Sequence, residues 1–229
     1  MKHKDFEEII SADRMRRYID ACNGNPQKGI TLYRYNLALS SELFKIISCF
    51  EVALRNRIDH ILEPHLGNDW LRDSCLPGGI FDDPKTLRTQ RIINKAYNEL
   101  NAIDAYTPTK LMAEMEFGIW KYMYSSPQYA CTGQRLLSVF PSKPKSTPTR
   151  QLDNKYIFNE LDRINQIRNR IAHHEPICFE AGLPLKSVTY VQNEYKRIFL
   201  LFTWMGIDGH SLLYGIDHIN NVCKKILSL

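Results

Sequence analysis

Three polar residues near the end of one predicted helix have the chemistry to cleave RNA. Arg168, Asn169 and His173 lie in the run IRNRIAHHEP, with four positions between the arginine and the histidine. RNA supplies its own nucleophile, the 2′-hydroxyl, so an enzyme needs only a proton acceptor, a proton donor and a cation near the phosphorus. Imidazole and guanidinium groups can provide these functions without a metal ion, so the residue types are compatible with such cleavage.

The spacing of the three residues indicates a role for each. Asn169 and His173 are four residues apart, so on a helix they stack on one flank, within reach of the long Arg168 side chain. We expect His173 to accept or donate a proton, Arg168 to hold the phosphate through paired N–H donors, and Asn169 to orient the phosphate or the histidine. His174, the next residue, is a second candidate histidine.

A helix predicted over residues 151–174 places Arg168 within an apolar stripe. At about 100° per residue, five apolar side chains fall within about 60° of Arg168: Ile157, Leu161, Ile164, Ile171 and Ala172. A guanidinium in the middle of such a stripe loses contact with water. That cost is usually tolerated only when the charge has a partner or a function.

A structural explanation of the same residues stays open. Arg168 can extend to a carboxylate such as Glu51 or Asp162, and His173 can simply cap the helix end. The R-x4-H spacing is also not specific, because the run RNRIDH from Arg55 to His60 repeats it.

The predicted helix separates Arg168 from His173 by about 140° around its axis, so one copy of the chain does not readily bring both to one phosphate. If the apolar stripe pairs with its copy about a two-fold axis, each composite site draws groups from both chains. The geometry therefore predicts a homodimer.

A second group of charged residues lies on the helix predicted over residues 31–62. Glu51, Arg55 and Asp59 are spaced at i, i+4 and i+8, a pattern that indicates a ladder of salt bridges. Structural ion pairs are the preferred interpretation. Glu51 or Arg55 can alternatively position Arg168 or line the same cleft.

Two basic clusters are candidate contacts for the RNA backbone. The run PSKPKSTPTR at 141–150 predicts an extended loop with three basic residues, Lys143, Lys145 and Arg150. A second cluster near the amino terminus consists of Arg14, Arg16 and Arg17. A formal net charge of +5 suits a polyanionic partner, although solvated surface charge is the commoner explanation for such clusters.

Apolar periodicity, interrupted by proline and glycine, predicts an all-α fold in a single domain, 1–229. Residues 1–20 are expected to form a short helix or a pair of turns, Pro64 and Gly67 to end the long helix, and Trp70 in the loop 67–84 to fold onto the core. The further helices are expected at 31–62, 85–104, 109–124, 128–139, 151–174, 187–205 and 214–227. No run alternates with period two, so we expect no sheet.

Several classes of protein are not supported by the sequence. Six cysteines are scattered without a CxxC pair and indicate reduced thiols, and His173-His174 has no metal-ligand spacing around it, so no metal site is expected. The amino terminus lacks the apolar run of a signal peptide. The longest apolar-rich run, Ile198 to Ile207, is about half of the ~20 residues that cross a bilayer, so we expect a cytoplasmic protein.

Four runs along the chain resemble those of a known family: LYRYNLALSSELFKIISCFEVALRNRI, GNDW, EFGIW and IRNRIAHHEPI. From about Ser11 to the last helices, the chain resembles the Abi-like (abortive infection) family of the HEPN superfamily. The resemblance implies an HEPN-type helical bundle with additional N-terminal and peripheral helices, often a two-fold dimer. It also implies an R-x4-6-H signature that faces across the interface as a metal-independent ribonuclease site. Arg168, Asn169 and His173 match that signature.

The resemblance implies a function in phage defence. We expect an endoribonuclease that degrades cellular or phage RNA when triggered, needs no cofactor, and has a neutralising protein or RNA as a candidate partner. Two alternatives stay open: a non-cleaving module of the same fold that holds a structured or regulatory RNA, and a structural dimer whose polar residues only fix register. Some HEPN toxins are modified at a tyrosine two residues after the histidine, but Glu175 stands there, which puts that regulation in doubt.

Overall fold

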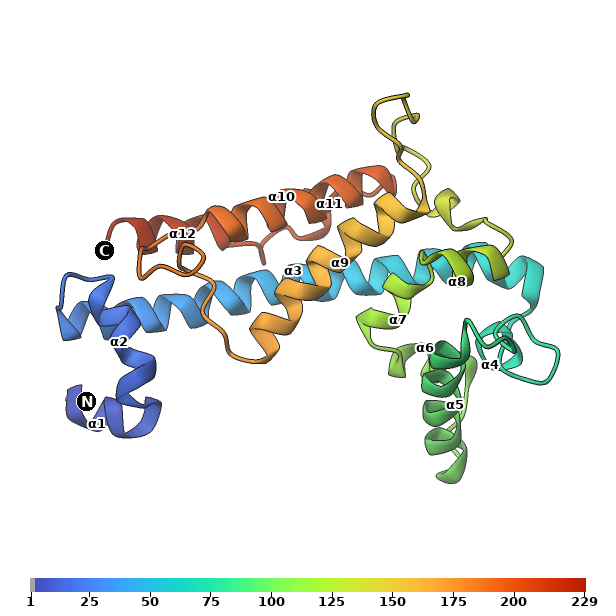
Figure 1. Cartoon of the computed structure of the whole chain (residues 1–229), viewed down its shortest axis with the longest axis horizontal. Helices are drawn as coiled ribbons and strands as arrows, with labels where there is room; N and C mark the ends of the chain where they lie inside the picture. The colour runs from blue at the N-terminus through green and yellow to red at the C-terminus, as the bar shows by residue number, and fades with distance from the viewer. Residues whose placement is uncertain (1–2) are drawn as a thin grey trace. The chain divides into compact units, whose positions relative to one another are not determined.

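The computed structural model describes residues 3–229, and helices dominate this part of the chain (Figure 1). No β-strand occurs among these residues, which contain only two isolated bridges, so the predicted all-α fold class is confirmed. The helices are α1 His3–Ile10, α2 Ala12–Asp20, α3 Pro26–Leu66, α4 Trp70–Asp73, α5 Leu87–Ala102, α6 Pro108–Glu114, α7 Phe117–Tyr122, α8 Ser126–Cys131, the 3-10 helix η1 Leu136–Val139, α9 Asn154–Ala172, α10 Thr189–Trp204, α11 Gly209–Leu212 and α12 Ile219–Leu227.

The chain divides into two compact units, each built from separate segments. The first unit comprises Met1–Ser48, Gln166–Leu200 and Asp208–Leu229. The second unit comprises Cys49–Asn165 and Leu201–Ile207. Helices α3, α9 and α10 each contribute residues to both units. The prediction of a single domain stays a prediction.

Helix α3 is longer than the sequence predicts. Its 41 residues begin at Pro26, where proline suits a first turn, and Asn25 caps it by accepting from the backbone N–H of Lys28 at 3.1 Å. The prediction that Pro64 ends the helix is wrong, because a proline in the last turn removes only one backbone hydrogen bond. The helix ends before Gly67, whose φ of 88° needs the conformational freedom of glycine.

Three of the predicted helices are shorter or interrupted. The segment expected as one helix over 109–124 forms α6 and α7, because Met115 and Glu116 are extended, with ψ of 124° and 158°. The segment 128–139 forms parts of α8 and η1, separated near Gly133 and Gln134, which both have positive φ. The last helix begins at Ile219 rather than at 214.

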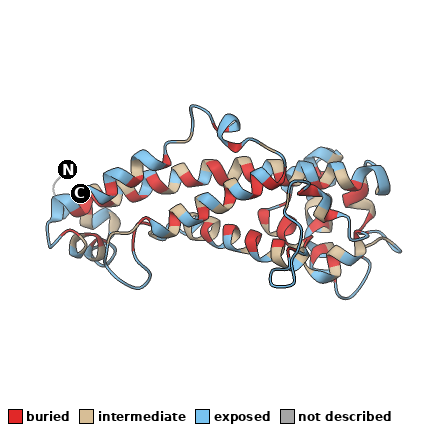
Figure 2. Cartoon of the chain, turned by 90° about the horizontal axis from the view of Figure 1, so that it is seen from above, coloured by how far each residue is buried: buried red, intermediate tan, exposed pale blue. Residues whose placement is uncertain are grey.

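Buried residues recur along the helices, between exposed ones (Figure 2). In the first unit the buried core includes Leu32, Leu39, Leu43, Ile46, Ile47, Ile167, Val191 and Ile198. In the second unit it includes Phe50, Leu54, Trp70, Phe81, Phe117, Trp120, Ile157 and Phe202. The expectation for Trp70 is confirmed: the ring is buried and its Nε1 donates to Asp59 Oδ1 at 2.8 Å.

Two observations concern disulfide-bonded and membrane-spanning proteins, two classes that the sequence does not support. All six cysteines are free thiols, four of them buried. In the described part of the chain, no helix is both long and apolar enough to span a bilayer.

The packing of α2 against the start of α3 depends on Gly29. A β-carbon at this position would lie 2.8 Å from Cγ1 and 3.1 Å from Cα of Ile19. Alanine in a helix is normally more stable than glycine by about 0.5–1 kcal/mol. We nevertheless expect Gly29→Ala to lower the free energy of unfolding by about 1–3 kcal/mol, measured by urea denaturation, because α2 must shift.

Gly118→Ala is the matched control. Gly118 lies in α7, and an added β-carbon would have no heavy atom within 4 Å. This substitution should leave the free energy of unfolding unchanged or raise it by up to about 1 kcal/mol. Equal effects of the two alanines would contradict the steric explanation.

Candidate functional site

The candidate residues lie at the end of α9: Arg168 and Asn169 belong to the helix, and His173 directly follows its last residue, Ala172. Four isoleucine and leucine side chains of this helix are fully buried: Ile157, Leu161, Ile164 and Ile167. Arg168 is only partly buried, Ile171 is intermediate, and Ala172 is exposed. The buried face includes Ile167, about 100° around the helix from Arg168. The prediction that Arg168 lies in the middle of the stripe is therefore wrong, because the residue lies at the edge of the buried face and is partly exposed.

The structure brings Arg168 and Asn169 together and places His173 one turn further on. Nη1 of Arg168 lies 3.4 Å from Oδ1 of Asn169, a long hydrogen bond in which the guanidinium donates. The backbone N–H of His173 donates to the carbonyl of Asn169 at 2.9 Å, so His173 still follows the helix, with its side chain exposed. All three residues belong to the first unit.

A Schellman motif ends α9 at the candidate histidines. The N–H of Glu175 donates to the carbonyl of Arg170 at 2.8 Å, and the N–H of His174 donates to that of Ile171 at 3.0 Å. His174 has a φ of 56°, the left-handed conformation that this motif usually gives to glycine. The helix thus ends at Ala172, two residues before the predicted end at 174.

Arg170 holds the first residues after the helix. Its Nε lies 3.1 Å from Glu175 Oε2, and its Nη2 donates to the carbonyl of Pro176 at 2.8 Å. Its guanidinium also lies over the ring of Tyr190, 5.0 Å from the centroid. Sequence reasoning did not single out Arg170, although a basic residue in the last turn of a helix is a general signal for carbonyl contacts.

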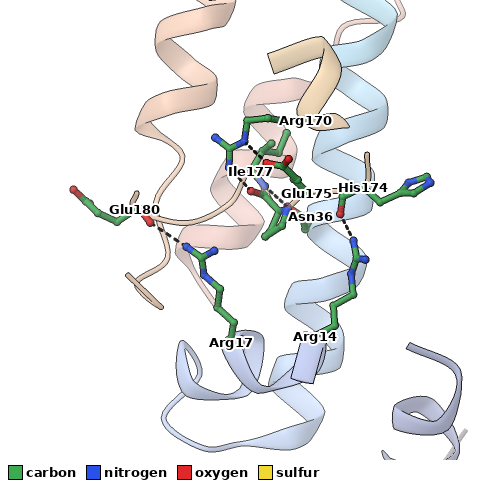
Figure 3. A network of polar contacts seen from close by, with 9 residues as sticks. Arg14, Arg17, Asn36, Arg170, His174, Glu175, Ile177 and Glu180 are labelled. Carbon is green, nitrogen blue, oxygen red and sulfur yellow. Dashed lines mark hydrogen bonds and ion pairs between the residues drawn. The ribbon is translucent and has the colours of Figure 1, made fainter. Parts of the chain in front are cut away.

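Two arginines of α2 donate to the backbone of the loop that follows α9 (Figure 3). Nη2 of Arg14 donates to the carbonyl of His174. Nη2 of Arg17 donates to the carbonyls of Glu180 at 3.2 Å and Leu183 at 3.0 Å, and its guanidinium lies 4.5 Å from the ring centroid of Phe179.

These contacts change the interpretation of the amino-terminal basic cluster. Arg14 and Arg17 bind the chain's own carbonyls, and Arg16 pairs with Asp13 at 2.8 Å. The hypothesis that this cluster holds RNA is therefore not supported. No local pattern in the sequence could reveal the contacts, because Arg14 and His174 are 160 positions apart.

A buried polar group and an aromatic cluster complete the support of the loop. Asn36 is 3% exposed, and its Oδ1 accepts from the N–H of Ile177 at 2.9 Å. Tyr18 contacts the rings of Phe179 and Tyr33, with centroids 5.0 and 5.3 Å apart. Burial raises the pKa of the Cys178 thiol to about 12, so this thiol next to the site stays protonated and is a poor nucleophile.

The predicted charge ladder on α3 does not extend from Arg55 to Asp59. Asp59 accepts from Trp70 instead, and Nε of Arg55 is buried without a hydrogen-bond partner. No ion pair joins Arg55 to Asp59 in the part of the chain that the structure describes. These residues and Glu51 belong to the second unit, and their suggested link to Arg168 stays a prediction.

Asp162, one of the two carboxylates suggested as a partner for Arg168, accepts from another residue. Nζ of Lys121 donates to its Oδ1 at 2.8 Å, with the lysine side chain 8% exposed. The Lys121 ammonium also lies 4.5 Å from the ring centroid of Tyr122. The Asp162 carboxylate therefore pairs with the buried Lys121 ammonium of the second unit.

The basic loop of the second unit is internally hydrogen-bonded and projects from α9 (Figure 1). Thr147 and Arg150 exchange backbone hydrogen bonds at 3.0 and 3.2 Å. Nη2 of Arg150 donates to the hydroxyl of Tyr156 at 2.6 Å, while Lys145 is exposed and Nζ of Lys143 reaches the carbonyl of Pro144 at 3.3 Å. The segment is a loop, as expected, but residues 147–150 form a hydrogen-bonded turn rather than an extended run, and the contact of the loop with RNA stays a prediction.

Within the described residues, no group of histidine, cysteine and carboxylate side chains is arranged to hold a metal ion. The neighbouring histidines His173 and His174 diverge in backbone conformation, because only His174 is left-handed. The chemistry available at this turn is therefore that of a guanidinium, an amide and exposed imidazoles.

The support of the loop by Asn36 predicts a measurable loss of stability. Asn36→Ala leaves the buried N–H of Ile177 without a partner, so we expect the free energy of unfolding to fall by about 1–3 kcal/mol, measured by chemical denaturation. Asn56→Ala, at an exposed position of the same helix, should change it by less than about 0.5 kcal/mol. A loss of similar size at both positions would show that this hydrogen bond contributes little.

One family of known proteins is similar to this chain over most of its length. A family model described as Abi-like protein matches residues 4–178. No curated protein and no solved structure matches the chain.

Proposed function

Because the chain belongs to the Abi-like protein family, we propose that it is a metal-independent endoribonuclease of the abortive-infection type, with an HEPN-like site. One observation carries the proposal. Arg168 and Asn169 lie partly exposed near the end of α9, with Nη1 of Arg168 3.4 Å from Oδ1 of Asn169, and the exposed His173 directly follows the last helical residue, Ala172. Such an arrangement offers a phosphate both a cation and a neutral donor, and an imidazole stands one turn away.

The proposed reaction is a transesterification within RNA. The 2′-oxygen attacks phosphorus while its proton passes to a base, and the 5′-oxygen leaves with a proton from an acid. The products are a 2′,3′-cyclic phosphate and a 5′-hydroxyl. His173 acts as acid or base, and Arg168 stabilises the charge on the phosphoryl oxygens.

Asn169 has a narrower role in this proposal. Its carbonyl oxygen accepts from Arg168, so its amide group remains free to donate two hydrogen bonds. The amide therefore orients the guanidinium and contributes a donor to the phosphate. The partial exposure of Arg168 lowers the cost of desolvation, so the charge does not require a buried carboxylate partner.

We propose a homodimer as the active form. Arg168 and His173 are about 140° apart around α9, so a second copy is the simplest source of the missing group at each phosphate. Exposed apolar side chains of the first unit, among them Leu37 and Phe44 on α3 at 45% and 42% exposure, provide surface that an interface would cover.

The nuclease proposal is tested by incubating the full chain with RNA in EDTA. We expect fragments that end in 2′,3′-cyclic phosphate. His173→Ala should lower the cleavage rate by about 10²–10⁴-fold, because the proton transfer is lost. His60→Ala is the matched control, since His60 closes the second R-x4-H run and is also exposed; it should cleave like the natural chain. Cleavage that survives His173→Ala would rule out this site.

The basic loop favours one alternative function, a module that binds RNA without cutting it. Lys143, Lys145 and Arg150 form a cationic loop, and the segment 141–152 contains no carboxylate. An RNA-binding surface of this kind would serve the nuclease as a substrate contact and the module as its main activity. The alternative predicts an intact but shifted RNA band in the cleavage experiment.

The contribution of the loop is measured as salt-dependent binding. We expect Lys143→Ala, Lys145→Ala and Arg150→Ala together, in a His173→Ala background, to weaken the binding of single-stranded RNA. The slope of log Kobs against log salt should fall by about 0.7 for each phosphate that the variant no longer neutralises. Fluorescence anisotropy with labelled RNA at several salt concentrations measures both quantities.

A control variant with the same change in charge separates local contact from net charge. It carries alanine at three exposed lysines elsewhere: Lys110, Lys224 and Lys225. This control should retain most of the affinity and most of the salt slope. Equal losses of RNA affinity in the two triple variants would show that the loop makes no specific contact with RNA.

A further inference from the structure

The turn that carries the candidate histidines is held from outside by a helix far away in the sequence. Arg14 lies in the first turn of α2, and its Nη2 donates to the carbonyl of His174 (Figure 3). That carbonyl belongs to the residue directly after His173, at the point where the Schellman motif turns the chain away from α9. The contact therefore acts on the geometry of the proposed catalytic turn.

His174 occupies a conformation that its residue type does not favour. Its φ of 56° is left-handed, which costs a non-glycine residue on the order of 1–2 kcal/mol. Two backbone hydrogen bonds of the motif oppose this cost, from the N–H groups of His174 at 3.0 Å and Glu175 at 2.8 Å. The hydrogen bond from Arg14 adds a charged donor on the carbonyl side of the same residue.

Capping and apolar packing hold α2, the helix that carries Arg14, in a fixed position. The side chain of Ser11 caps the helix by accepting from the backbone N–H of Arg14 at 3.3 Å. Met15 and Tyr18 are buried at 0% and 1% exposure, and Tyr18 packs on Tyr33 of α3. The arginine therefore extends from a helix whose apolar face is anchored.

The two loop-binding arginines of α2 have different targets. Arg17 holds the distant part of the loop, through the carbonyls of Glu180 and Leu183 and the ring of Phe179. Arg14 contacts the backbone next to the histidine of the proposed site. Of these two arginines, Arg14 is thus the one placed to control the orientation of the His173 side chain.

We propose that Arg14 is a positioning residue of the site: by donating to the carbonyl of His174 it maintains the left-handed turn and so fixes the orientation of the His173 imidazole. The inference rests on the proposed nuclease function for its effect on catalysis. Its effect on the turn is independent of that function. A displacement of α2 from the loop, by a ligand or partner, would accordingly switch the site off.

The test uses the full chain and the variants Arg14→Ala, Arg14→Lys and Arg16→Ala. Arg16 is the matched control, because it lies on the same helix and pairs with Asp13 at the surface. Cleavage of single-stranded RNA in EDTA gives kcat and KM. We expect Arg14→Ala to lower kcat by about 10²-fold with KM within about twofold, the size of effect expected from a displaced catalytic group. Arg14→Lys should recover part of kcat, and Arg16→Ala should match the natural chain.

A second measurement does not depend on activity. Hydrogen exchange of the backbone amides of His174 and Glu175, followed by NMR, reports the Schellman hydrogen bonds directly. We expect exchange at both amides to be at least about tenfold faster in Arg14→Ala than in Arg16→Ala, since the turn opens more often. The Glu175 amide of Arg14→Ala/His174→Gly should regain protection, because glycine adopts the left-handed conformation without strain.

The outcomes are distinguishable. Unchanged exchange at His174 and Glu175 in Arg14→Ala overturns the proposal, whatever happens to cleavage. Faster exchange together with a fall in kcat supports it. Faster exchange in a chain that never cleaves RNA supports the role of Arg14 in the turn and counts against the nuclease. A fall in kcat with unchanged exchange assigns Arg14 a direct contact with RNA and overturns the positioning role.

Discussion

The candidate site depends on one constraint, which is that polar backbone groups must find hydrogen-bond partners where the chain leaves α9. The turn begins with a left-handed histidine, and the loop beyond it forms little regular structure. Side chains from α2, α3 and α9 itself therefore provide the missing partners. Arg14 and Arg17 donate to carbonyls, Asn36 accepts from an N–H, and Arg170 spans Glu175 and Pro176. The position of the site is set by this hydrogen bonding rather than by apolar packing alone.

The exposure of Arg168 alters the physical argument for its function. A fully buried guanidinium would need a carboxylate partner, and the resulting ion pair would leave it unable to bind phosphate. Arg168 lies at the edge of the buried face, is partly exposed, and donates to Asn169. The apolar stripe of α9 still positions the helix through Ile164 and Ile167. One side of α9 therefore packs into the core, and the residues of the proposed site lie at the edge of that side.

Much of the fold could be predicted from periodicity, because long amphipathic helices such as α3, α9 and α10 carry a strong local signal. The interruption at Met115 and Glu116 could not, since neither residue is a glycine or proline, whereas Gly133 directly precedes Gln134 at the second interruption. Arg168, Asn169 and His173 were predicted as the site from their spacing and from family resemblance, and their role stays a prediction. Arg14 and Asn36 were not, because their partners lie more than a hundred positions away and are backbone atoms that leave no trace in residue identity.

The first unit extends beyond the part of the chain that the family model matches. The family match ends at Cys178, yet Val191, Ile198, Leu213 and Cys223, all buried, lie beyond it in the same unit. A shortened chain that stopped at the end of the match would expose the apolar surface that those side chains cover. The boundaries of the recognisable sequence and of the folding unit therefore differ. Fragments of this protein intended for biochemistry need the carboxyl-terminal helices as structural components, whatever the sequence match suggests.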